Sequence, residues 1–163
     1  MRAILAPLRV FNFWKKPGSV GVNVSKEDLI HIYVIFIRSV LEQSCVVWGP
    51  AITDSEAKSI ERIQKICLYI IYQDKYGSYE NALKLSNLPK LDERRTQLSL
   101  RFALKCAANE KTKHMFPMNE TDSQTRNPEK YLVPFAYHNR LKKSAIPEMA
   151  RQLNEHYKSK KQK

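Results

Sequence analysis

The sequence predicts a mainly α-helical protein, a small bundle of about four to five helices with basic, flexible tails. Apolar residues recur at spacings of three and four along several segments, which is the period that places side chains on one face of a helix. Two of these segments follow a Ser or Thr with an acid three positions later, as helix N-termini do. No alternation of apolar and polar residues is long enough to predict a strand. At 163 residues, the chain is about the size of one domain.

The N-terminal segment, residues 1–25, is predicted to be a poorly ordered basic leader. It contains Arg and Lys but no Asp or Glu, and Pro7, Pro17 and Gly18 oppose one long amphipathic helix. This composition also resembles a mitochondrial transit peptide, so mitochondrial targeting by residues 1–24 is kept as an alternative. Otherwise we expect an intracellular protein, cytoplasmic or nuclear, because the three cysteines are widely spaced among apolar residues and suit a reducing compartment.

Residues 26–109 are predicted to form the helical core. Its first helix is capped by Ser25 and ends at Gly49 and Pro50, because proline cannot donate a hydrogen bond to the helical ladder. The apolar stripe predicted for this helix comprises Leu29, Ile32, Tyr33, Phe36, Ile37, Val40, Leu41 and Ser44.

A second helix is expected from the capping box of Thr53 and Glu56 to about Tyr72. Its predicted inward residues are Ile60, Ile63, Cys67, Ile70 and Ile71. The residues assigned a structural role at the junction of the two helices are Cys45, Trp48 and Pro50. We expect the Trp48 ring to fill the end of the two-helix core.

Two further helices complete the predicted core, a short one over residues 79–85 capped by Ser78 and a longer one over residues 91–109. In the longer helix Arg95 shares the apolar face, so its stem is expected to cover apolar surface while its charged head stays in water.

The C-terminal part divides into three predicted segments. Residues 110–130 are polar, and residues 110–137 are predicted to be a linker or long loop. Residues 138–157 are predicted to form an amphipathic helix region, and residues 158–163 a disordered basic tail.

The sequence offers few candidates for catalysis, metal binding or cofactor binding. Cys45 lacks a basic neighbour that would lower its pKa, so a packing role is favoured over a nucleophilic one. Glu56 and Glu61 could act as paired carboxylates, although a solvated helix face is the simpler interpretation. No glycine-rich phosphate loop and no Cys/His spacing typical of zinc occurs, so neither a cofactor nor a metal is expected.

The net charge of +12 favours a polyanionic partner. Half of this surplus falls in residues 138–163. The candidate contacts to nucleic-acid phosphates are Arg94, Arg95, Arg101, Lys105, Arg140, Lys142, Lys143 and Arg151. The alternative is that these residues only keep the surface soluble.

Several ordered blocks resemble the region that follows the polymerase domain in jockey-like non-LTR retrotransposon reverse transcriptases. The blocks are Tyr33 with FIRSVLE (36–42), CVVW (45–48) and SIERIQK (59–65), then SYENAL (78–83), LPKLDERR (88–95), and SAIP (144–147) with RQLN (151–154). The resemblance covers about residues 26–156. It implies a helical segment after the polymerase thumb, with an ancestral role in supporting template RNA or target DNA.

The family's catalytic residues are absent from this sequence. The family's polymerase centre uses two adjacent aspartates and a third aspartate to hold two magnesium ions. The aspartates here are Asp28, Asp54, Asp74, Asp92 and Asp122, and none is adjacent to another. The endonuclease and RNase H motifs and the Cys/His knuckle of relatives are also absent. We therefore expect no enzyme, and the resemblance transfers no catalytic residue.

Three functional interpretations follow. The first is a non-catalytic C-terminal fragment of a retrotransposon RNA-directed DNA polymerase that binds RNA or DNA backbones without sequence preference. The second is a helical module that binds a protein or itself through exposed apolar helix faces. The third is a genomic relic without a selected function. None of the three requires a membrane, since no apolar run reaches transmembrane length.

Overall fold

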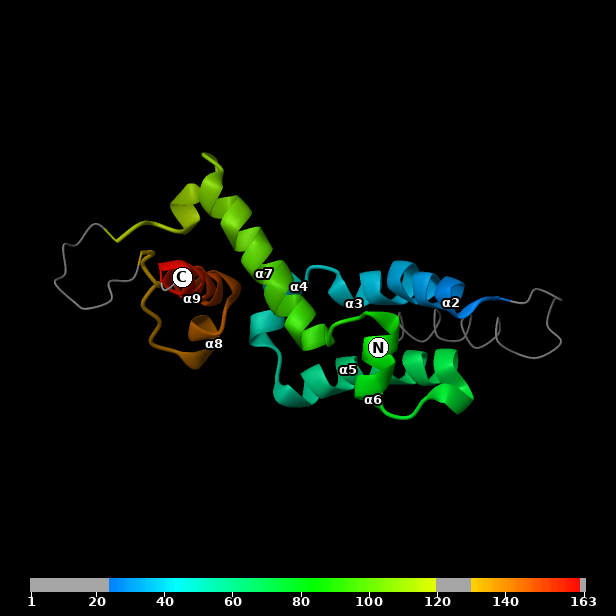
Figure 1. Cartoon of the computed structure of the whole chain (residues 1–163). Helices are drawn as coiled ribbons and strands as arrows, with labels where there is room; N and C mark the ends of the chain where they lie inside the picture. The colour runs from blue at the N-terminus through cyan, green and yellow to red at the C-terminus, as the bar shows by residue number, and fades with distance from the viewer. Residues whose placement is uncertain (1–23, 120–129, 162–163) are drawn as a thin grey trace. The chain divides into compact units, whose positions relative to one another are not determined.

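The computed structural model describes residues 24–119 and 130–161, and these residues are mainly α-helical, as predicted (Figure 1). The chain forms two compact units, each assembled from two separate stretches of sequence. Unit 1 contains Met1–Gln43 and Thr53–Arg94, and unit 2 contains Ser44–Ile52 and Arg95–Lys163. The predicted basic leader lies outside the described residues, except for Val24 and Ser25.

Unit 1 begins with a helical segment that is not a uniform α-helix. It consists of α2 (Lys26–Ile32), the π-helical η1 (Tyr33–Arg38) and α3 (Ser39–Glu42). Ser25 caps its start as predicted, because the Ser25 hydroxyl accepts a hydrogen bond from the Asp28 backbone N–H at 3.1 Å.

The buried face of this segment differs from the predicted stripe. Its buried residues are Leu29, Tyr33, Ile37 and Leu41, at a constant spacing of four, whereas Phe36 and Val40 are exposed. In an α-helix each step of four overshoots a full turn by about 40°. A π turn contains more residues per turn, so a step of four rotates the chain by less and compensates for this overshoot. The four buried residues therefore stay on one face.

The rest of unit 1 consists of α5 (Asp54–Tyr72), the 3₁₀ turn η3 (Gln73–Lys75) and α6 (Tyr79–Ser86). Thr53 and Glu56 form the predicted capping box, and Ser78 caps α6. The buried residues of α5 are Gln64, Cys67, Leu68, Ile71 and Tyr72, while the predicted inward residues Ile60, Ile63 and Ile70 are only partly buried.

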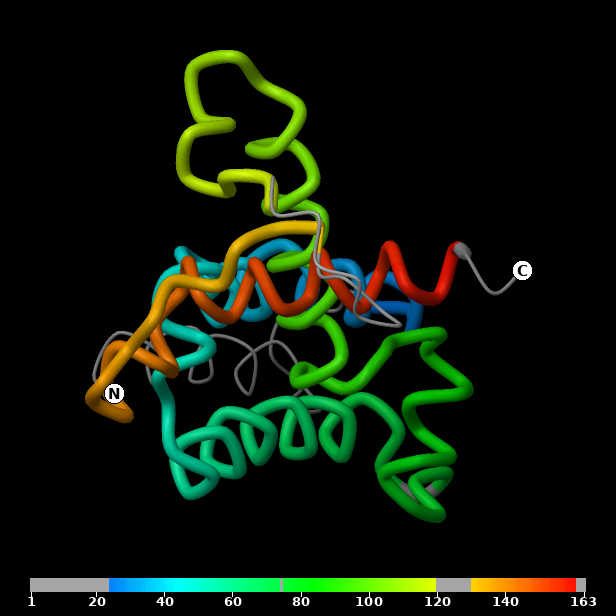
Figure 2. Tube along the Cα trace, turned by 90° about the vertical axis from the view of Figure 1, so that its left-hand side faces the viewer, coloured from blue at the N-terminus to red at the C-terminus, as the bar shows by residue number. Residues whose placement is uncertain are grey.

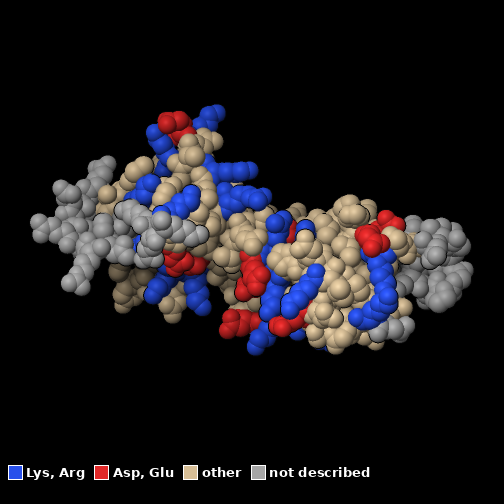
Figure 3. Space-filling view, viewed as in Figure 1, with Lys and Arg blue, Asp and Glu red and all other residues tan. Residues whose placement is uncertain are grey.

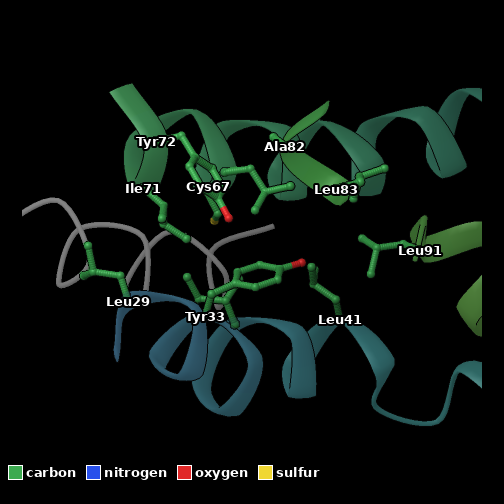
Figure 4. Packing of buried hydrophobic residues seen from close by; sticks show 11 residues of the cluster. Leu29, Tyr33, Leu41, Cys67, Ile71, Tyr72, Ala82, Leu83 and Leu91 are labelled. Carbon is green, nitrogen blue, oxygen red and sulfur yellow. The ribbon is translucent and has the colours of Figure 1, made fainter. Parts of the chain in front are cut away.

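The core of unit 1 lies between the α2–α3 segment and the α5–α6 pair (Figure 4). The Tyr33 ring extends from the first segment toward the second, and Ala82 and Leu83 of α6 complete this core. Leu91, the first residue of α7 (Leu91–Ala108), also belongs to it.

Unit 2 contains α4 (Cys45–Trp48), the 3₁₀ turns η2 (Gly49–Ala51) and η4 (Lys113–Met115), α8 (Asn139–Lys142), α9 (Ala145–Lys161) and α7 from Arg95 onward. Its core joins α7 to α9. The buried apolar residues of this core are Ala103, Cys106, Phe116, Tyr131, Met149, Ala150 and Leu153.

The predicted junction at Gly49 and Pro50 is displaced toward the N-terminus. The first helical segment breaks at Gln43 and Ser44, where Ser44 adopts the left-handed conformation with φ 52°. The residues after the break belong to unit 2, where α4 and η2 contact α9. Cys45 is buried, but Trp48 is only partly buried and does not fill the end of a two-helix core in unit 1.

Two of the predicted C-terminal boundaries also change. Phe116 and Tyr131, which fall in the predicted linker, are buried in the core of unit 2, and Met118 forms a β-bridge with Tyr131. Residues 120–129 of that linker lie outside the described residues. The predicted disordered tail begins too early, since α9 continues to Lys161, while residues 162–163 are not described.

Candidate nucleic-acid interface

The positive charge is concentrated in unit 2. This unit contains 15 of the 28 Lys and Arg residues but only 6 of the 16 Asp and Glu residues, so it carries +9 of the net +12. A phosphate-binding surface is therefore expected on unit 2, because its surplus is not offset by neighbouring acids.

Two of the predicted phosphate contacts are held inside the protein. Arg94 Nε lies 3.1 Å from Glu42 Oε1, and the same carboxylate lies 3.2 Å from Arg38 Nε, so Arg94 ties the start of α7 to α3 within unit 1. Arg95 is buried, with 7% of its surface exposed, and its stem packs close to Gly49. The expectation that the Arg95 head stays in water is wrong, since nearly all of the residue is buried.

Arg101 and Lys105 lie on the exposed face of α7. Their spacing of four places them on the same side of the helix, opposite the buried residues Ala103 and Cys106. In Figure 3, Lys and Arg side chains project from the C-terminal half of α7 and outnumber the acidic ones there.

A second exposed cluster, the basic trio, consists of Arg140, Lys142 and Lys143, at and directly after α8. Within the described part of the chain, none of the three takes part in an ion pair. Arg151, the remaining candidate, has a different role. Its guanidinium bonds to the Glu148 carboxylate and donates to the backbone carbonyl of Lys142 at 2.7 Å.

Residues 132–143, the anchored arm, are fixed to α9 near both ends, through Tyr131 directly before the arm and through Lys142 within it. At the first end, the buried Asn154 amide forms two hydrogen bonds with the backbone of Tyr131, one from the Tyr131 N–H at 2.8 Å and one to the Tyr131 carbonyl at 2.9 Å. At the second end, Arg151 bonds to the Lys142 carbonyl. Figure 2 shows the segment in orange, running beside α9 before it turns into α8.

The anchored arm also presents two aromatic rings that the sequence analysis missed. Phe135 is 89% exposed and Tyr137 is 85% exposed, the largest exposed fractions among the described large apolar side chains. The Tyr137 and His138 rings form a T-shaped pair, with 5.1 Å between the ring centroids and a 90° interplanar angle. The sequence gives no signal for this exposure, since an isolated aromatic residue is usually buried.

Unit 1 contains a buried polar network centred on Gln64. The Tyr33 hydroxyl donates to Gln64 Oε1 at 2.6 Å, and Gln64 Nε2 donates to the Tyr79 hydroxyl at 3.0 Å and to the Pro89 carbonyl at 3.1 Å. Tyr79 in turn donates to Glu61. Burial raises the pKa of both tyrosines.

Glu61 does not form a carboxylate pair with Glu56. Its Oε2 accepts from the backbone N–H of Leu91 at 3.1 Å, which places an anionic group at the N-terminus of α7. Glu56 belongs to the capping box, where the backbone N–H of Thr53 lowers the pKa of the Glu56 carboxyl. Both carboxylates therefore hold helix ends.

The three cysteines, Cys45, Cys67 and Cys106, are free thiols and all are buried. Burial raises the pKa of Cys67 to about 12, which opposes thiolate chemistry at this position. Within residues 24–119 and 130–161, no three His, Cys, Asp or Glu side chains come together in a way that could hold a metal ion.

An apolar surface, the η1–α3 face, lies on unit 1. Its members Ile35, Phe36 and Val40 are 60%, 61% and 39% exposed. Among the described helices, none alone is long and apolar enough to cross a membrane, although Lys26–Glu42 and Cys45–Ala51 taken as a bent pair have the length and composition to do so.

Comparisons of this chain with protein-family models, with curated proteins and with solved structures found no match. The candidate interface is therefore defined by the structure alone. It consists of Arg101, Lys105 and the basic trio, all exposed on unit 2, with two exposed rings beside the trio.

Proposed function

We propose that this chain binds RNA or DNA through backbone phosphates, without sequence preference, and that unit 2 carries the binding surface. The observation that carries the proposal is the charge of +9 on unit 2 together with its exposed basic residues Arg101, Lys105 and the basic trio. Lys and Arg side chains on helices contact phosphates rather than base edges unless a helix enters a groove, so little sequence preference is expected.

We further propose that the chain corresponds to the C-terminal, post-polymerase region of a jockey-like retrotransposon reverse transcriptase, without polymerase chemistry of its own. The ordered sequence blocks support this origin. Two of these blocks, SIERIQK and LPKLDERR, are joined in the structure by a hydrogen bond from the Leu91 N–H, at the first residue of α7, to the Glu61 carboxylate.

The test is a titration of a labelled, unstructured RNA with the full chain, followed by fluorescence anisotropy at about 50 and 200 mM salt. Binding should weaken steeply with salt, because each neutralised phosphate releases a counterion. Replacing Arg140, Lys142 and Lys143 together by Gln should weaken binding and reduce the slope of log K against log salt by about 2, as expected for three lost contacts on a single strand.

The matched control removes the same charge from unit 1, by replacing its exposed residues Lys58, Arg62 and Lys84 with Gln. This control should retain most of the affinity and the salt slope. Negligible binding at both salt concentrations would overturn the proposal. Equal weakening by the two triple variants would assign binding to net charge and remove unit 2 from its central role.

The η1–α3 face supports a second candidate function, an interaction module that binds a protein or a second copy of the chain. Exposed Ile35, Phe36 and Val40 lie together on one segment of unit 1, and exposed apolar clusters are common at protein interfaces. Sedimentation across a range of protein concentrations separates the two functions, since a monomer with salt-sensitive RNA binding favours the first.

A further inference from the structure

We propose that the anchored arm binds single-stranded nucleic acid by stacking unpaired bases on Phe135 and Tyr137, while the basic trio contacts the phosphates. This inference rests on the proposed function and adds the class of ligand and the residues that select it.

The two aromatic rings of the anchored arm are exposed to solvent. With 89% and 85% of their surface in water, Phe135 and Tyr137 contribute little to the core of unit 2, and both offer ring faces to a ligand. An aromatic face stacks with any unpaired base, since every base has a π-face. Such stacking adds affinity without sequence preference, which fits the phosphate contacts expected beside it.

The positive charge of the basic trio lies close to these rings in the sequence. Arg140 follows Tyr137 by three residues, and Lys142 and Lys143 follow in the same short stretch. Single-strand binding surfaces combine aromatic rings with a positive groove along the backbone, and the anchored arm supplies both within twelve residues, 132–143. Near Arg101 and Lys105, by contrast, the exposed aromatic ring within two residues is Phe102, and it is only 45% exposed.

Hydrogen bonds to α9 hold the anchored arm in place. Asn154 holds one end of the arm through two hydrogen bonds, and Arg151 holds the other through the Lys142 carbonyl. Both anchors lie on α9, so the arm is presented by a rigid helix, and ordering it on binding costs little conformational entropy.

The same surface chemistry also fits an anionic membrane, where aromatic and basic residues gather at the interface. Nucleic acid is favoured because interfacial membrane binding usually uses the long apolar face of an amphipathic helix. The arm contains only the single turn α8, Asn139–Lys142. The experiment therefore distinguishes membrane binding from nucleic-acid binding.

The experiment measures binding of the full chain to three probes at fixed salt: an unstructured RNA of about 20 nucleotides, a duplex with the same number of phosphates, and inorganic polyphosphate. The wild-type chain should prefer the single strand. The double variant Phe135→Ala/Tyr137→Ala should lose about five-fold or more in single-strand affinity for each ring removed. Its affinity for polyphosphate and its salt slope should be unchanged, because the basic trio remains.

A matched control is Tyr69→Ala, which removes a ring from a residue with 60% exposure in unit 1. It should leave all three affinities unchanged. A second readout uses Tyr137→Trp, whose indole emission should be quenched by the unstructured RNA and not by polyphosphate. Thermal unfolding should show the same melting temperature for the double variant and the wild type, since both rings are exposed.

The outcomes separate this inference from the proposed function. Salt-sensitive binding that ignores strandedness and the two rings would overturn the inference and leave the proposed function in place. Absence of salt-sensitive binding to any polyanion would overturn both. Ring-dependent binding to vesicles of phosphatidylserine and phosphatidylcholine, without ring-dependent RNA binding, would overturn the inference in favour of a membrane.

Discussion

At the scale of single residues, Gln64 organises unit 1. Its side chain is fully buried on α5, and its amide joins Tyr33 on η1 to Tyr79 on α6 and to the Pro89 carbonyl before α7. A buried amide is tolerated only when its donors and acceptor are satisfied, so this one side chain fixes the relative placement of four segments of unit 1.

The variant Tyr33→Phe tests this network. It removes the hydroxyl that donates to Gln64 Oε1 and leaves that buried acceptor without its 2.6 Å hydrogen bond. The free energy of unfolding should fall by about 1–3 kcal/mol, measured by urea denaturation. Tyr69→Phe is the control, because Tyr69 is 60% exposed, and it should change stability by less than about 0.5 kcal/mol. Equal effects of the two variants would contradict the role assigned to Gln64.

At the scale of elements, the break at Ser44 divides what the periodicity predicts as one helix. Ser44 has φ 52° and ψ 21°, a left-handed conformation that costs free energy for a residue with a Cβ atom. The break allows Leu41 to end the buried face of unit 1 and Cys45 to begin a buried position in unit 2. The strain is therefore offset by burial on both sides.

The variant Ser44→Gly should relieve this strain and raise the free energy of unfolding by up to about 1 kcal/mol, since glycine adopts the left-handed region freely. The same substitution within a regular helix, Ser59→Gly in α5, should lower it by about 0.5–1 kcal/mol. The opposite signs are measured by chemical denaturation. A loss of stability in both variants would show that Ser44 is not held in the left-handed conformation.

At the scale of the whole molecule, apolar and charged groups are divided between the two units. Unit 1 contains the buried Tyr33, Tyr72 and Cys67 and a nearly balanced charge, with 13 basic and 10 acidic residues. Unit 2 contains most of the positive surplus and the exposed rings. We therefore expect binding to depend on unit 2.

The predicted pH dependence follows mainly from groups in unit 1, and Tyr131 of unit 2 contributes in the same direction, because burial raises its pKa to about 12. Burial raises the pKa of Cys67 from its ordinary value of 9.0 to about 12, and it also raises the pKa values of Tyr33 and Tyr79. Below pH 9 these groups are protonated in both the folded and the unfolded chain, so their contribution to stability is fully present. Above pH 9 the unfolded chain loses protons that the folded chain retains, and the free energy of unfolding should fall as the pH rises toward 12.

Urea denaturation at pH 7.5, 9 and 10.5 checks this expectation. The variant Cys67→Ala should be less stable than the wild type at neutral pH because of the cavity it creates, but its stability should decline less between pH 9 and 10.5. Identical pH profiles for the two proteins would remove Cys67 from the explanation.

Much of the local structure could be predicted from the sequence. The caps at Ser25, Thr53 and Ser78 are where the sequence places them, because each hydroxyl needs only a backbone N–H three residues away. The π turn of η1 could not be predicted, because its residue Tyr33 is positioned by packing and hydrogen bonding to Gln64 of α5, which is distant in sequence.

The candidate site was predicted only in part. Exposed Arg101 and Lys105 follow from helical periodicity, whereas the burial of the Arg95 head was not predicted, although Arg95 lies on the apolar stripe. The roles of Arg94 and Arg151 depend on Glu42 and on the Lys142 carbonyl, and no local pattern identifies such partners. Exposure of Phe135 and Tyr137 depends on how the Asn154 and Arg151 anchors hold the arm, which is likewise a tertiary property.

The sequence by itself determined the helical class, the helix starts and the excess of positive charge, because each depends on composition or on neighbours within about one turn. Only the tertiary structure decided that the chain divides into two units at Ser44 and Arg95, which arginines are held by internal partners, and which rings remain in water. The reason is physical: burial and ion pairing depend on which segments pack together, and residues far apart in the sequence decide that packing.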